Sequence, residues 1–293
     1  MWSGFGGLVI GVRDLAAAEA AYAALLGRPP AWRALAAGEG CLGSGFAVGN
    51  ALLELRAPAG EAAEARALGA WLEARGEGLH AVVLASDDVP ATARELGIRG
   101  IQAGGASPRA GPGPASPFAA ALRLPGAATR GVPVLVAAAA SLPPRTESAD
   151  GASVAALDHV VLASRDPDAA RAVWGGTLGL RVALDRRFEA RGLRILFLRL
   201  GGVTVEVTGP LDAGAGDPGP DGFFGVAWRV GDVEAARERV AAAGFDVSDV
   251  RAGHKPGTRV CTVRGRTHGV ATLLIGPDPT GAAGPGSATL PPS

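Results

Sequence analysis

The apolar and polar positions along this chain repeat one pattern four times, within residues 7–14, 79–88, 156–166 and 225–232. At each place a short apolar run ends at an aspartate, and an amphipathic stretch containing alanines follows it. Such a run predicts a buried strand, and an aspartate ahead of apolar residues at helical spacing predicts a helix N-cap. Four copies of one strand–helix unit predict a repeat architecture.

The copy at 156–166 is the clearest, and the segment after it completes a larger unit. Residues 157–163 predict a mostly buried strand, and Asp166 followed by Pro167 predicts the start of a helix that Gly179 ends. Three further strands are predicted, at 181–184, 194–200 and 203–208. The unit is therefore β-α-β-β-β.

Two landmarks recur at one spacing, which indicates an internal duplication. His159 stands 152 positions after Gly7, and Glu206 stands 152 positions after Glu54. A shared offset at independent landmarks predicts two related domains, joined by a polar, proline-containing linker. The predicted divisions are a less well preserved N-terminal domain at 1–140, a linker at 141–152, a C-terminal domain at 153–278 and a disordered tail at 279–293. Disorder is also predicted for part of 104–117.

The composition of the chain limits the classes of partner that it is expected to bind. The 293 residues are 48% hydrophobic, and 28 basic residues balance 28 acidic ones, so the net charge is zero. Nucleic acids and anionic membranes attract excess positive charge, so neither is expected as the main partner. Cys41 and Cys261 lie far apart and predict two buried thiols in a reducing compartment. No export signal opens the sequence and no apolar run is long enough to span a bilayer, so a cytoplasmic location is expected.

The strongest sign of chemistry is a carboxylate inside an apolar strand. In the strand at 203–208, Thr204, Glu206 and Thr208 share one face and the valines share the other. A buried glutamate is costly unless it is paired or ligated. Glu206 and His159 together have three interpretations. They form a metal site, a metal-free acid–base or substrate-binding pair, or the remnant of a lost site. An imidazole and a carboxylate suit Fe, Mn, Ni, Zn or Mg.

The tandem β-α-β-β-β units, opened by Leu-Asp-His-Val-Val and closed by Val-Glu-Val, resemble the vicinal oxygen chelate superfamily of glyoxalases, extradiol dioxygenases, methylmalonyl-CoA epimerase and bleomycin resistance proteins. The resemblance implies an α+β fold in which paired βαβββ modules form half-barrel sheets, with two glyoxalase-like domains in tandem. It also implies divalent-metal ligands on the first and last strands of each unit. The implied positions are His159, Glu206, Gly225 and Leu273 in the second domain, and Gly7, Glu54, Ala81 and Leu135 in the first.

Only three of these eight positions carry a side chain that binds metal, namely His159, Glu206 and Glu54. Catalytic metals usually have about three protein ligands, so a third would have to come from elsewhere. His254 and His268 are the nearest candidates in the sequence, although both are expected in solvated loops.

Three basic residues are candidates for holding the substrate. Lys255 and Arg259 flank a Pro-Gly turn that leads into a strand, and guanidinium groups grip carboxylates with two donors. An ordinary polar hairpin explains this segment equally well. Arg229 shares strand parity with Gly225 and is expected to face the cleft. Arg199 interrupts another apolar strand, and either pairs with Glu206 or reaches solvent.

Two functional hypotheses fit these observations. The first is an enzyme of the glyoxalase or dioxygenase kind, a lyase, isomerase or dioxygenase in which His159 and Glu206 hold a divalent metal that chelates a small oxygen-bearing substrate. The second is a metal-free module that binds or sequesters a small molecule, as bleomycin resistance proteins do. The resemblance is also compatible with a homodimer, although the internal duplication already supplies paired units.

Overall fold

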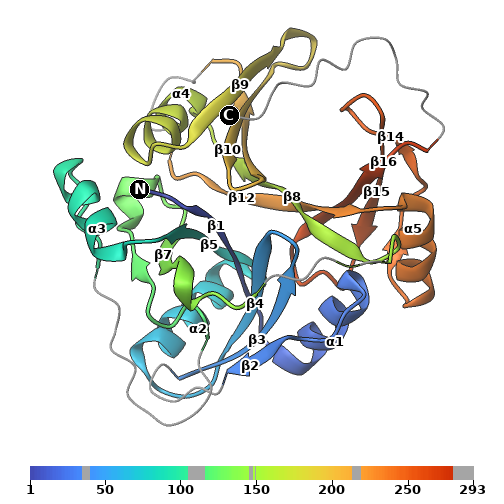
Figure 1. Cartoon of the computed structure of the whole chain (residues 1–293), viewed down its shortest axis with the longest axis horizontal. Coiled ribbons are helices and arrows are strands. Elements are labelled where there is room, and N and C mark those ends of the chain that lie inside the picture. Colours follow the sequence, from blue (N-terminus) through green and yellow to red (C-terminus); the bar gives the residue numbers. More distant parts are fainter. Residues whose placement is uncertain (35–39, 105–115, 145–147, 149, 213–218, 280–293) are drawn as a thin grey trace.

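The computed structural model describes residues 1–34, 40–104, 116–144, 148, 150–212 and 219–279. Its strands form two mixed sheets, one in each half of the chain, so the predicted α+β class is confirmed (Figure 1). The disorder predicted within 104–117 and over the tail falls largely on 105–115 and 280–293, which lie outside the described residues. The domain boundaries at 140, 152 and 278 stay a prediction.

The first sheet has the strand order β2-β3-β4-β1-β5-β7-β6. Its strands are β1 (Gly4–Gly11), β2 (Trp32–Ala34), β3 (Cys41–Val48), β4 (Ala51–Pro58), β5 (Gly78–Ser86), β6 (Leu122–Arg123) and β7 (Val134–Ala138). The helices of this half are α1 (Leu15–Leu26), α2 (Ala63–Arg75) and α3 (Val89–Ile98), with short 3-10 turns at Gly126–Thr129 and Ala139–Ser141. Asp14 and Asp88 cap α1 and α3, as the repeat predicts.

The second sheet has the order β13-β15-β16-β12-β8-β11-β10-β9, and β14 pairs with β15 beside this path. Its strands are β8 (Val154–Ala163), β9 (Arg181–Phe188), β10 (Leu193–Leu200), β11 (Val203–Pro210), β12 (Gly222–Val230), β13 (Asp246–Val247), β14 (Arg251–Ala252), β15 (Thr258–Arg264) and β16 (Ala271–Pro277). The helices are α4 (Pro167–Arg171) and α5 (Val233–Ala242), and a 3-10 turn spans Glu189–Arg191. The sheet curves, with α4 and α5 on its outer side (Figure 1).

The strand register confirms the duplication. Gly7 on β1 lies opposite Leu52 on β4, and His159 on β8 lies opposite Thr204 on β11, in the same parallel arrangement. Strands β3 and β10, like β4 and β11, have bounds that differ by 152 positions. The two halves therefore repeat one another in hydrogen bonding as well as in sequence.

The helix predicted to run from Pro167 toward Gly179 changes type on the way. The α-helix ends at Arg171, and Ala172–Thr177 form a π-helix in which the Leu178 amide donates to the Val173 carbonyl. The stretch contains two consecutive glycines, which weaken the preference for the tighter α-helix.

The inner faces of the two sheets differ. In the first half, Val9, Leu52, Val83 and Leu135 on the inner face are buried, and Phe118 packs against them. In the second half, the valines of β11 and Trp228 are fully buried on the outer face, beneath the helices. The inner face there carries half-buried side chains instead. Among the residues that the structure describes, only the second sheet therefore offers a reachable inner surface.

The two halves are joined by many hydrogen bonds. The Asn50 side chain accepts from the Leu157 amide at 2.9 Å and donates to the Leu157 carbonyl at 2.8 Å. The Tyr22 hydroxyl donates to the Thr267 carbonyl at 3.0 Å, and Arg239 donates to the Leu25 carbonyl at 2.8 Å. Backbone groups are the main acceptors across this interface.

The two cysteines and the lengths of the helices bear on expectations drawn from the sequence. Cys41 and Cys261 are both buried and form no disulfide in the described structure, which confirms the prediction of separate thiols. None of the helices within the described residues combines the length and the apolar character needed to cross a membrane.

Candidate functional site

A β-bulge in β8 places two polar side chains on one face. His159 lies opposite Ala227 and Leu157 lies opposite Trp228, so Asp158 is an extra residue in the pairing with β12. Leu157 is buried in the core, whereas Asp158 and His159 are both half-buried on the inner side. Regular alternation would have sent Asp158 to the opposite face.

Glu206 reaches the same place from the neighbouring strand. It lies on β11 opposite Val161, and its Oε1 atom is 3.7 Å from His159 Nδ1. The same Nδ1 atom is 2.9 Å from Asp158 Oδ1. The side chains of His159 and Glu206 are 16% and 19% exposed, so a small molecule can reach them while bulk water is partly excluded. The structure therefore brings together the pair that the sequence predicts and adds Asp158.

The three side chains of this cluster shift one another's pKa values. Burial alone would lower the pKa of His159, but the hydrogen bond to Asp158 and the charges of Glu206 and Asp158 outweigh it and raise the pKa above its ordinary value. The same hydrogen bond lowers the pKa of Asp158 despite its burial. Burial raises the pKa of Glu206, although the charge of His159 opposes that rise.

Three cations surround the cluster. The charges of Lys255 and Arg229 both act to lower the pKa of Asp158, and the charge of Arg199 acts to lower that of Glu206. All three cationic side chains belong to exposed residues. They lie near enough for their charges to favour an anionic ligand at this face.

Arg259 is not part of the cluster. Its neighbour Val260 pairs with Ile275, and Arg259 itself projects to the outer side, where it forms a 2.7 Å ion pair with Glu234 of α5. The expectation that Arg259 holds substrate came from its residue type beside a turn. Strand parity instead directs it to the helix-covered face.

The other metal-ligand candidates do not join the pair. His268 Nδ1 lies at a hydrogen-bond distance of 2.9 Å from Glu77 Oε2 of the first half, and His254 is exposed in its loop. At Gly225 an added Cβ would lie 2.3 Å from the Ala271 carbonyl oxygen, so no side chain fits there without a strand shift. Across the parts of the chain that the structure describes, no three His, Cys, Asp or Glu side chains are arranged to hold a metal ion.

The equivalent glutamate of the first half has a structural role. Glu54 is 1% exposed, accepts from Arg56 at 2.9 Å and is hydrogen bonded by the Ser116 hydroxyl. Phe118 packs against the buried apolar side chains of this inner face, so the protein's own side chains close it. The first half therefore offers no counterpart of the His159 cluster.

Apolar side chains flank the cluster on both sides along the inner face. Phe197 on β10 lies opposite Glu206, and Leu273 and Ile275 on β16 follow beyond β12. All three are half-buried. The arrangement offers a polar centre for oxygen atoms and apolar walls for a carbon skeleton.

The comparisons with known proteins agree with this architecture. Residues 158–262 match the family model of the glyoxalase/bleomycin resistance protein/dioxygenase superfamily, and residues 8–156 match a glyoxalase-like domain. The chain belongs to this superfamily, with two such domains in tandem. The predicted resemblance is confirmed.

The individual proteins that the chain resembles have low sequence identity to it. An ethylmalonyl-CoA/methylmalonyl-CoA epimerase of Cereibacter sphaeroides is 31% identical over 97 residues, which are 31% of this chain and 72% of that protein. A mutant of 4-hydroxymandelate synthase from Streptomyces coelicolor has a TM-score of 0.70 at 16% identity, covering 98% of this chain and 95% of that one. The Mn(II)-bound glyoxalase from Novosphingobium aromaticivorans has a TM-score of 0.65 at 18% identity, covering 94% and 82%. These two structures share the fold.

Proposed function

We propose that the inner face of the second domain binds a small organic molecule with an anionic oxygen, and that His159 transfers a proton to or from it. The supporting observation is one imidazole held 2.9 Å from Asp158 and 3.7 Å from Glu206 at a half-buried position. A histidine oriented by a carboxylate is a common arrangement for general acid–base catalysis. Arg229 and Lys255 would attract the anion.

The hydrogen bonding selects the reactive atom. Because Nδ1 donates to the ionised Asp158, the lone pair of the neutral ring lies on Nε2, which is then the atom that accepts a proton. Glu206 stabilises the charged ring after that transfer. The epimerase relative is consistent with this chemistry, since inversion at a carbon beside a carbonyl proceeds by removal and return of a proton.

A divalent metal is the second candidate basis for activity. His159 and Glu206 would hold it, because both donors stand on adjacent strands and face the same side. When bound, such an ion supplies a Lewis acid that stabilises negative charge on substrate oxygens. Two protein ligands are fewer than the usual number of about three, so water or substrate would have to complete the coordination.

The test follows exchange of the acidic C–H proton of candidate ligands for deuterium, observed by proton NMR. The candidates are a methylmalonyl thioester, a 2-oxo acid and a 1,2-diketone, each with chelator-treated protein and with added Mn²⁺ or Zn²⁺. The variants are His159→Gln and Glu206→Gln, and Glu234→Gln is the matched control because its carboxylate lies on the outer side.

We expect exchange with at least one ligand, slowed by about 100-fold or more in His159→Gln and unchanged in Glu234→Gln. Exchange that appears only with added metal would favour the metal-dependent mechanism, in which His159 and Glu206 hold a divalent ion. Binding without exchange would indicate a sequestering protein of the bleomycin-resistance type. Equal exchange in His159→Gln and the control would contradict the proposal.

A further inference from the structure

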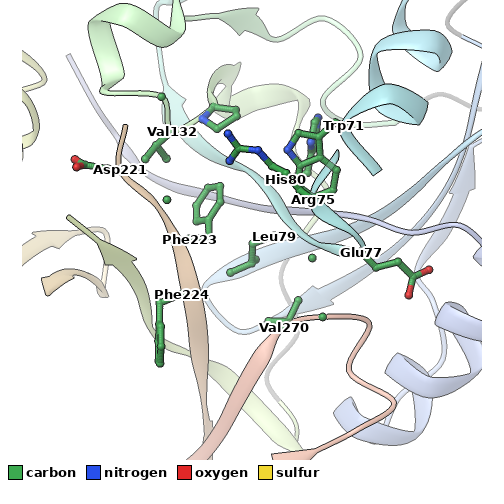
Figure 2. Close-up of a pocket in the computed structure, with 15 residues that line it drawn as sticks. Trp71, Arg75, Glu77, Leu79, His80, Val132, Asp221, Phe223, Phe224 and Val270 are labelled. Atoms are coloured by element: carbon green, nitrogen blue, oxygen red, sulfur yellow. The ribbon is translucent and has the colours of Figure 1, made fainter. Parts of the chain in front are cut away.

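A hollow lies between the two domains, lined by residues of both halves of the chain (Figure 2). It has a volume of about 260 Å³, close to the lower end of the roughly 300–1,000 Å³ typical of small-molecule pockets. Its walls come from the end of α2, the start of β5, the turn before β7, the start of β12 and the turn before β16. Phe223 on β12 pairs with Leu162, whereas Ala227 further along pairs with His159.

Fixed contacts bracket this hollow on two sides. On one side Arg130 and Asp221 form a 3.0 Å ion pair, and the Asp221 amide donates to the Arg130 carbonyl at 2.7 Å. On the other side Glu77 pairs with His268 at 2.9 Å. The backbones also approach closely there, because a Cβ added at Gly269 would lie 1.8 Å from the Glu77 carbonyl oxygen. The domains are therefore held together around a space that they do not fill.

Each of the two acidic residues of the lining has a basic partner, Arg130 for Asp221 and His268 for Glu77, although Asp221 Oδ1 is buried without a hydrogen-bond partner in the described structure. Besides pairing with His268, Glu77 accepts from the Arg13 amide at 2.7 Å. Arg75, the last residue of α2, is exposed, and its side chain has no ion-pair or hydrogen-bond partner within the described part of the chain. Figure 2 shows Arg75, His80 and Trp71 gathered at one end of the hollow.

Aromatic rings supply the other surface. Phe223 and Phe224 lie along the β12 wall in Figure 2, and Trp71 meets His80 edge to face with ring centroids 4.7 Å apart. Phe224 sits at a bulge between Phe223 and Gly225 and is 63% exposed, which is unusual for so large an apolar side chain. A ligand ring packed on Phe224 would remove that exposure.

We propose that this interdomain hollow binds a small aromatic carboxylate, whose ring packs against Phe223 and Phe224 and whose carboxylate pairs with Arg75. A single-ring acid suits the volume, and a guanidinium matches the geometry of a carboxylate with two parallel donors. The inference does not depend on the chemistry assigned to His159.

The experiment measures binding of three probes to the full chain by calorimetry and saturation-transfer NMR. Benzoate has both ring and charge, benzyl alcohol has the ring alone and acetate has the charge alone. The variants are Arg75→Gln and Phe224→Ala, both at exposed positions where folding should be unaffected. Arg94→Gln on α3 removes an exposed charge elsewhere, and Arg229→Gln removes a charge near His159.

We expect benzoate to bind more tightly than either other probe. Arg75→Gln should weaken benzoate binding by about tenfold or more, because it removes a charged hydrogen-bond donor to the carboxylate, and should leave binding of the uncharged benzyl alcohol unchanged. Phe224→Ala should weaken benzoate and benzyl alcohol alike. The proposal is overturned if benzoate binds no better than acetate, if Arg75→Gln behaves like Arg94→Gln, or if only Arg229→Gln abolishes benzoate binding.

Discussion

His80 should make the folded protein lose stability as the pH falls below neutral. The imidazole is largely covered, and its Nδ1 atom is buried without a hydrogen-bond partner in the described structure. Burial, followed by the charges of Arg56 and Arg123, lowers the pKa of His80 to about 4. In the unfolded chain the same group titrates near its ordinary value of about 6.5.

The direction of this pH effect on stability follows from the number of protons that the folded and unfolded states bind. Above the unfolded pKa neither state binds a proton at His80, so the group has no effect. Between about 6.5 and about 4 the unfolded chain is protonated and the folded one is not, so stability falls as the pH falls. The difference amounts to about 2 kcal/mol between about pH 7 and pH 5, and about 3 kcal/mol at about pH 4.

The assay is urea unfolding followed by tryptophan fluorescence at about pH 7 and about pH 5. His80→Gln should show a loss on acidification smaller than wild type by about 2 kcal/mol. His254→Gln, at an exposed loop position, removes a histidine without removing the buried one and should match wild type. Contributions of other groups, including His159, are common to all three proteins and cancel. Identical pH dependence in His80→Gln and wild type would show that burial of His80 does not set this loss of stability.

Three further outcomes follow from packing and charge. Gly225→Ala should lower the melting temperature and cost about 1–3 kcal/mol, because its Cβ would meet a carbonyl oxygen at 2.3 Å, whereas Gly222→Ala on the same strand meets nothing within 4 Å and should be tolerated. Arg130→Met should cost about 3–5 kcal/mol in urea unfolding, since Asp221 is 2% exposed and would be left unpaired, and adding Asp221→Asn should recover part of that loss. Burial raises the pKa of Cys261 to about 11, so a disulfide reagent at about pH 8 should modify that thiol only after unfolding.

Much of the fold could be predicted because the duplication is written in the sequence. The offset between Gly7 and His159 returns as an identical strand register, and the alternation in β11 returns as a buried valine face. The closure of the first inner face could not be predicted. Phe118 lies outside any strand or helix pattern, and its packing depends on a long-range contact that local periodicity does not encode.

The candidate site was predicted in part. His159 and Glu206 meet as strand geometry requires, but Asp158 joins them only because of a bulge, and one extra residue in a strand leaves no mark on the apolar pattern. The Asp-His dipeptide in front of an apolar run was the available signal. Arg259 shows the reverse, since a suitable residue type beside a turn was placed on the outer side by parity with its neighbours.

The contacts between the halves have an evolutionary consequence. Arg239 donates to the Leu25 carbonyl, Arg99 donates to the Thr177 carbonyl, and Arg28 donates to the Val154 carbonyl. Every amino acid carries a main-chain carbonyl, so residues on the receiving side can drift in sequence without breaking the bond. At these three bonds the sequence requirement falls on the arginine, so the residues that supply the carbonyls can diverge while the two halves stay docked.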